Sequence, residues 1–290
     1  MAPRDQAIPE ALYRNAINLN RYSNGVARRV IDAYNDIILD ASFQLAAIDE
    51  VTSPGTTLRL RTLLAQLQDS LGTWAINSTT VTQEQLQGLA VLQSEFIQDQ
   101  LRKVLPSDAA KAAVRTVEIS PQFAQSVVTT DPTRVNVFTL PEELTAQVTG
   151  VSPTFSLTAR EGAVITLPNG ATVQKAFRGL ATQQADLFTR TVRNGLLTGE
   201  TTQNIARRLK GRLQFNQEGN VRQVIAAGGQ LTKLANNQVL TIVRTSINQV
   251  SNAATQKVYQ ANSDITDQYR YVATLDSRTS AICARLDGQI

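Results

Sequence analysis

The sequence predicts a predominantly helical α+β protein with three regions. Apolar residues recur at helical spacing over most of the chain, a pattern typical of amphipathic helices. In the middle of the chain that spacing gives way to β-branched runs punctuated by prolines. We therefore expect an N-terminal helical region (1–113), a short β-containing connector (114–172) and a C-terminal α+β domain (173–290).

The N-terminal region is expected to form a helical hairpin or a small bundle. An apolar pattern of helical spacing runs from 8 to 48, and Asn24-Gly25 is expected to divide it into two helices. A second apolar stripe runs from 60 to 74. The sequence at 82–85 matches a capping box and predicts the start of another helix, which should end shortly before Pro106.

The connector contains two short β-branched runs, 135–138 and 163–166, and the turn pair Asn169-Gly170. Short strands among many Thr, Pro and Ser residues fit two structures. One is a small β-containing insertion, and the other is a partly extended linker that wraps a partner.

Helices are expected again from Thr172 onward. One should end near Asn194-Gly195, a short helix should follow the turn at 198–202, and a long helix should cover 231–259. A strand is then expected at 269–275. This order of helices and one late strand predicts an α+β C-terminal domain.

Composition excludes several classes of active site. The chain has no histidine, so neither a Ser-His-Asp or Cys-His relay nor a histidine-ligated zinc site can form. Its single cysteine, Cys283, excludes an intrachain disulfide and a multi-cysteine metal site. Glycines with the spacing of a phosphate-binding loop are also missing. We therefore expect a protein that is not an enzyme and that holds no metal and no cofactor.

Charge and hydropathy say less about partners. The net charge of +4 is compatible with DNA nearby but too small to indicate it. No apolar run has the length of a membrane span, and the first residues lack the apolar segment of a signal peptide. We expect synthesis in the cytoplasm and no membrane contact.

The polar turn at 276–280 is the most distinctive motif. At a strand end, Asp276 can accept hydrogen bonds from backbone amides, and Thr279 or Ser280 can cap a following short helix. Arg278 can pair with a carboxylate or present its guanidinium group to a partner. The turn is therefore a structural corner, or a corner that also binds a partner. It lacks the nucleophile, base or metal cluster of a reaction centre.

Arg244-Thr245 lies in the middle of the predicted long helix, among apolar residues. An arginine there needs a partner if it is buried. We hypothesise that Arg244 pairs with Asp276, or with Asp287 of the turn Asp287-Gly288, and so anchors the helix to the corner.

The densest basic run lies at the end of the predicted short helix. It comprises Arg207, Arg208, Lys210 and Arg212, with Arg222 slightly downstream. A solvated helix end is one interpretation, because cations are favoured at a helix C-terminus. Salt-sensitive contact with DNA phosphates, or contact with an acidic partner, is the other.

Together these C-terminal motifs resemble a known signature. The Arg-Thr pair, the long helix, the strand, the Asp-x-Arg-Thr-Ser turn and the Leu-Asp-Gly turn are similar to the C-terminal part of phage head morphogenesis proteins, a family that includes the Mu F-like minor head proteins. The resemblance covers about 195–290. Another strand should follow Asp287-Gly288, so the domain is expected to be cut short at its C-terminus.

The resemblance implies a minor capsid protein that sits inside the phage head near the portal vertex, in several copies around the portal protein. It implies a role in head assembly, genome packaging or DNA delivery by binding and positioning. The major capsid or scaffold protein and packaged double-stranded DNA are further partners in this picture. Two alternatives stay open: a DNA-contacting ejection protein, and the non-catalytic part of a longer chain with an enzymatic C-terminal domain.

Overall fold

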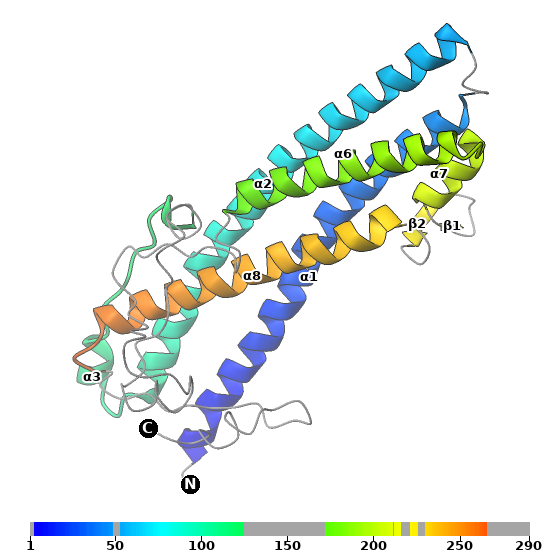
Figure 1. Cartoon of the computed structure of the whole chain (residues 1–290). Coiled ribbons are helices and arrows are strands. Elements are labelled where there is room, and N and C mark those ends of the chain that lie inside the picture. Colours follow the sequence, from blue (N-terminus) through cyan, green and yellow to red (C-terminus); the bar gives the residue numbers. More distant parts are fainter. Residues whose placement is uncertain are drawn as a thin grey trace, which may run out of the picture. The chain divides into compact units, whose positions relative to one another are not determined.

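The computed structural model of the chain describes residues 3–48, 53–124, 172–210, 212–215, 221–225 and 230–265. Most of the predicted connector and the whole of the C-terminal block that contains the polar turn lie outside these residues. The described chain forms helices and one β-hairpin (Figure 1). The helices are α1 (Pro3–Ala46), α2 (Pro54–Val104), α3 (Asp108–Ala112), α6 (Val173–Leu197), α7 (Thr202–Lys210) and α8 (Gln230–Ala261). The strands are β1 (Arg212–Phe215) and β2 (Val221–Ile225), which pair antiparallel.

The predicted helical character is confirmed, but the predicted strands are not supported. The runs at 135–138, 163–166 and 269–275 lie outside the described residues. The hairpin of β1 and β2 falls where the sequence predicted no strand. Its alternation of apolar and polar residues is too short to stand out from a loop.

Two predicted helix boundaries are wrong, because α1 and α2 run through them without a break. In α1, exposed Gly25 is followed by Val26, Ala27 and Val30, which are all buried. Burial of those side chains outweighs the cost of about 1 kcal/mol for one helical glycine. In α2, the predicted capping residue Thr82 is fully buried in mid-helix.

In the polar stretch before Thr82, two hydroxyl groups find partners within the helix. Thr79 donates to the carbonyl of Ala75 at 2.7 Å, and Thr80 to that of Ile76 at 3.2 Å. These bonds to the preceding turn satisfy hydroxyl groups that would otherwise compete with the helix backbone. The predicted end of this helix is confirmed, since α2 stops at Val104, just before Pro106.

The described chain groups into two compact units. One comprises Met1–Asn20, Leu86–Gly170 and Ile247–Ile290, and the other Arg21–Gln85 and Ala171–Ser246. We call them the first and the second unit. The three-region division predicted above follows chain order, whereas each unit is assembled from separate stretches, with α1, α2 and α8 contributing to both.

An aromatic cluster forms the centre of the second unit. The rings of Tyr34 and Trp74 lie 5.4 Å apart, and those of Trp74 and Phe177 lie 5.7 Å apart, edge to face. Trp74 Nε1 donates to the carbonyl of Val30 at 3.0 Å, and the Tyr34 hydroxyl donates to Gln184 Oε1 at 3.0 Å. Because buried polar groups need their partners, these two bonds fix how α1, α2 and α6 face one another within the unit.

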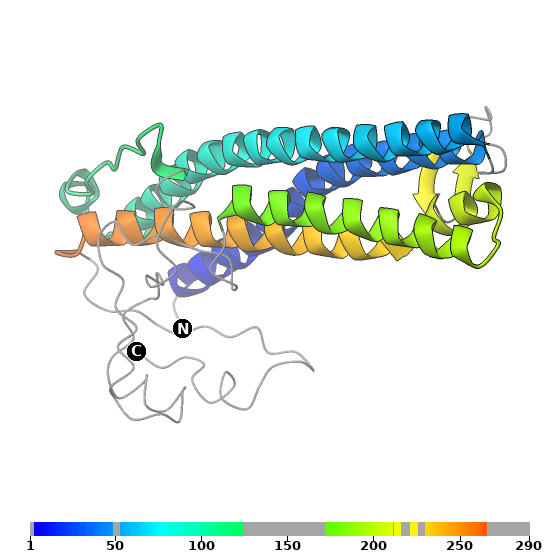
Figure 2. The ribbon, with the colours of Figure 1, turned by 45° about the horizontal axis from the view of Figure 1, so that its top comes forward.

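In the second unit, α6 lies beside α8 and is followed closely by α7 (Figure 2). Thr172 caps the start of α6 by accepting from the Lys175 backbone amide at 3.1 Å, which confirms the predicted start. At its end, the amide of Glu200 bonds to the carbonyl of Gly195 at 2.8 Å, and Gly199 adopts a positive φ of 74°. This is a Schellman motif, which needs a glycine because side chains disfavour that backbone conformation.

In the first unit, side chains of α2 and α8 hold an irregular segment at 114–124. Asn262 Oδ1 accepts from the Arg115 amide at 2.7 Å, and Arg115 Nη2 pairs with Asp264 at 3.0 Å. Gln87 donates to the carbonyl of Ser120 at 2.7 Å and accepts from the amide of Ala124 at 2.9 Å. Side chains thus bond several backbone groups of segment 114–124 that have no strand partner.

Candidate functional site

The predicted corner lies outside the described residues. That holds for Asp276, Arg278, Thr279 and Ser280, and equally for Asp287 and Gly288. Their roles therefore stay predictions, and so does the pairing of Arg244 with Asp276 or Asp287.

Arg244 itself is described, and it has an unforeseen partner. Its side chain is exposed on α8, and its Nε and Nη2 donate to Asn24 Oδ1 on α1 at 3.1 and 2.7 Å. Thr245 beside it is half-buried. Arg244 thus ties α8 to α1 in the second unit. The sequence drew attention to Asn24 as a helix breaker, whereas the structure makes it an acceptor.

The predicted basic run is partly engaged in local contacts. On α7, Arg208 pairs with Glu200 at 3.0 Å and donates to the carbonyl of Thr191 at 3.4 Å. The Lys210 ammonium lies 4.4 Å from the centre of the Phe43 ring, a cation–π contact. Arg207 is exposed.

Arg212 and Arg222 belong to β1 and β2 by their backbones. The described side chains of the basic run are those of α7, so the structure does not test whether all five cations share one face.

The short helix α7 is held in place by buried contacts. The Thr202 hydroxyl donates to the carbonyl of Ile48 at 2.7 Å. Ile205 is fully buried against Gly195 of α6, so closely that a methyl group on Gly195 would lie 2.6 Å from two of its carbons. The position of α7 therefore depends on a glycine in α6.

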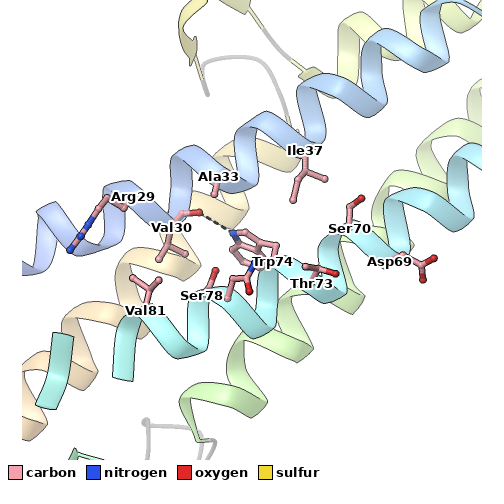
Figure 3. Close-up of a pocket in the computed structure, with 11 residues that line it drawn as sticks. Arg29, Val30, Ala33, Ile37, Asp69, Ser70, Thr73, Trp74, Ser78 and Val81 are labelled. Carbon is pink, nitrogen blue, oxygen red and sulfur yellow. Dashed lines mark hydrogen bonds between the residues drawn. The ribbon is translucent and has the colours of Figure 1, made fainter. Parts of the chain in front are cut away.

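A groove of about 580 Å³ runs between α1 and α2 in the second unit (Figure 3). Arg29 lies at one end and Asp69 at the other, with Trp74 between them. The other lining side chains are mostly small or hydroxylated, namely Val30, Ala33, Ile37, Ser70, Thr73, Asn77, Ser78 and Val81. The lining offers a cation, a carboxylate and several hydroxyl groups for contact with a ligand.

Two tyrosines of the second unit have perturbed acidity. Burial raises the pKa of the Tyr34 hydroxyl above its usual range. Burial also raises the pKa of Tyr22, with the nearby Arg29 guanidinium acting in the opposite direction. The Tyr22 hydroxyl donates to Gln85 Oε1 at 2.9 Å, and Arg29 donates to the same oxygen at 3.1 Å. These hydroxyls are structural donors in the protonated form.

Within the described ranges, no group of three or more His, Cys, Asp or Glu side chains could hold a metal ion. Among the same residues, we find no helix that is long and apolar enough to cross a membrane.

Comparison with known proteins places the C-terminal part of the chain in a family. Residues 186–290 match the family model described as phage Mu protein F like protein. This match supports a relationship to a family of phage head morphogenesis proteins, and we call residues 186–290 the Mu F-like region. No curated protein and no solved structure matches the chain.

The Mu F-like region begins within α6 and takes in α7, β1, β2, α8 and the C-terminal block with the polar turn. The resemblance inferred from the sequence over about 195–290 is therefore confirmed. The Mu F-like region contains Arg244 and all five members of the predicted basic run. The groove between α1 and α2 lies outside it.

Proposed function

We propose that the protein is a structural component of a tailed-phage head that binds the portal protein or the inner capsid surface and assists head assembly. The match of residues 186–290 to the Mu F-like family, which supports a role in phage head morphogenesis, carries this proposal. In this role the protein works by binding and positioning, and it catalyses no reaction.

The fold agrees with such a role. The described chain consists of long amphipathic helices, and its two units each join stretches that are far apart in sequence. Several large apolar side chains stay exposed on these helices, including Tyr13 at 53%, Leu58 at 66% and Leu92 at 64%. Exposed apolar side chains on helices are suited to contacts with other subunits.

The location and partners follow from the same proposal. The protein resides in the virion, inside the head at the portal vertex, in several copies around the portal. The major capsid or scaffold protein and the packaged DNA are secondary partners. The stage of action is assembly or packaging, and ejection is the alternative.

Heads assembled with and without portal protein test the proposal. The chain should be present in several copies in complete heads and lost from heads that lack the portal, while the major capsid protein stays at the same level in both. Cross-linking of complete heads should join the chain to the portal. Equal amounts of the chain in both kinds of head would refute portal binding.

A further inference from the structure

The outer face of α6 carries a stripe of positive charge. Lys175, Arg178, Arg190 and Arg193 are all exposed. At ~100° per residue they fall within about 120° of the helix circumference. The buried face, with Phe177, Gln184, Phe188 and Val192 among its members, lies on the opposite side. We call these four cations the α6 stripe.

The charge is concentrated in this part of the chain. Residues 172–210 contain seven Lys and Arg against two acidic residues, Asp186 and Glu200. The remaining 21 basic and 22 acidic residues of the chain nearly cancel. The net positive charge of the protein therefore resides in α6 and α7.

The cations of the α6 stripe are not engaged in ion pairs with other described residues. Among the described residues, none of its four members forms an ion pair, whereas Arg208 on α7 is paired with Glu200. Arg208 also reaches the carbonyl of Thr191, so α7 lies beside the C-terminal half of α6. The α6 residues that contact α7, Thr191 and Gly195, lie on the side of α6 opposite the stripe, so the exposed Arg207 of α7 is not counted with it.

The surface between the two halves of the stripe is shallowly hollowed. One hollow of about 290 Å³ is lined by Lys175, Arg178, Gly179 and Thr182, among others. A neighbouring hollow of about 580 Å³ includes Thr182, Asp186 and Arg190. Leu187 and Leu234 also line the larger hollow. The cations therefore stand along a shallow trough of mixed polar and apolar lining that leaves room for a ligand backbone.

We propose that the α6 stripe binds the phosphate backbone of double-stranded DNA without regard to sequence. From Lys175 to Arg193 the stripe measures about 27 Å at the helical rise of ~1.5 Å per residue. One turn of B-DNA measures about 34–36 Å, so one duplex turn can face the whole stripe.

The features of the stripe favour duplex DNA over other anions. A small anion would need converging cations, whereas these are spread along a line. Single-strand binding uses aromatic platforms, whereas the four stripe positions are one lysine and three arginines. A protein partner needs a larger apolar centre than Leu187 and Leu234, the two leucines of the larger hollow, provide. Binding to the regularly spaced phosphates of a duplex, by contrast, requires only a line of cations.

The test measures binding of the full-length chain to a duplex of about 30 base pairs by fluorescence anisotropy at several salt concentrations. Four phosphate contacts predict a log–log salt slope near −3.6, so that affinity falls about 150-fold between 50 and 200 mM salt. A variant with Lys175→Gln, Arg178→Gln, Arg190→Gln and Arg193→Gln removes all four contacts, so its slope should be close to zero.

A control variant removes the same charge elsewhere. Arg21→Gln, Arg28→Gln, Arg59→Gln and Arg61→Gln neutralise four exposed arginines of α1 and α2. The control should keep the full slope. Equal loss in both variants would show that net charge alone drives binding, and it would overturn the proposal. Circular dichroism checks that both variants are folded.

A third variant reverses the sign of the effect. Asp186→Asn removes the one carboxylate in the middle of the stripe, so it should tighten DNA binding at low salt. Unchanged or weaker binding would count against the stripe as the site. Polyglutamate and vesicles with anionic lipids serve as competing probes, and stronger binding to either than to DNA would also overturn the proposal. Portal binding is measured separately, so its outcome leaves this one unaffected.

Discussion

Two glycines of α6, Gly195 and Gly179, should respond in opposite ways when each is replaced by alanine. A methyl group on Gly195 would lie 2.6 Å from two carbons of Ile205, and Ile205 is fully buried and cannot turn away. A methyl group on Gly179 would meet nothing within 4 Å. Both substitutions gain the same helix propensity, about 1 kcal/mol. Overpacking costs about 1–3 kcal/mol, and only Gly195→Ala incurs it.

The difference between the two variants therefore isolates the clash. Gly179→Ala should raise the free energy of unfolding by about 0.5–1 kcal/mol. Gly195→Ala should fall below Gly179→Ala by about 1–3 kcal/mol. Trp74 is the single tryptophan of the chain and lies in the core of the second unit, which contains both glycines. Its fluorescence during urea denaturation reports the unfolding of that unit directly.

A second substitution shows whether Ile205 is the cause. Ile205→Val removes the outermost clashing carbon, and alone it should cost about 0.5–1.5 kcal/mol. In the Gly195→Ala background it should cost less or even stabilise, because the pair is coupled through contact. Equal stability of Gly195→Ala and Gly179→Ala would refute the close packing of α6 against α7.

The remaining predictions concern side-chain hydrogen bonds of the second unit, each followed by tryptophan fluorescence in urea. Tyr34→Phe leaves buried Gln184 Oε1 without its donor and should cost about 1–3 kcal/mol. Burial raises the pKa of Tyr34, so its neutral hydroxyl stabilises the fold below pH ~10, and this stability is lost as the pH rises further. Tyr34→Phe has no hydroxyl to ionise and should therefore lose less stability over the same rise in pH. Thr202→Val removes a buried bond of 2.7 Å and should cost about 1–3 kcal/mol, whereas the neighbouring exposed substitution Thr201→Val, which removes only a cap, should cost about 1 kcal/mol. Arg244→Lys cannot reproduce the two bonds to Asn24, but because these bonds are exposed, the variant should lose less than about 1 kcal/mol of stability. A larger loss would contradict this account.

Local signals in the sequence predicted the helices where tertiary packing agreed with them. The helix start predicted near Thr172 and the long helix predicted at 231–259 recur in α6 and α8. Asn24-Gly25 and Thr82 misled the prediction, because buried neighbours on both sides keep the helices continuous. Helix boundaries of this kind depend on contacts with distant segments, which local residue patterns do not contain.

For the candidate sites too, local motifs were predicted from the sequence and groupings of distant residues were not. The C-terminal motifs led to the family, because a compact motif is legible in sequence. The α6 stripe was missed as a group: Arg178 and Arg190 are twelve positions apart, so they form no run, and only their shared helix face unites them. Arg244 was expected to pair with a carboxylate, and among the described residues its acceptor is Asn24, 220 positions away.

The bond between Tyr34 and Gln184 has a consequence for synthesis on the ribosome. Its two residues are 150 positions apart, and Trp74 is likewise synthesised long before Phe177, the ring that it contacts. At about 5–20 residues per second, roughly 8–30 s separate the emergence of Tyr34 from that of its partner. During that interval, the apolar faces of α1 and α2 have no other layer of the second unit to pack against. The nascent chain is thus a candidate client for chaperones that capture exposed aromatic segments, and slower translation would prolong its vulnerability to aggregation.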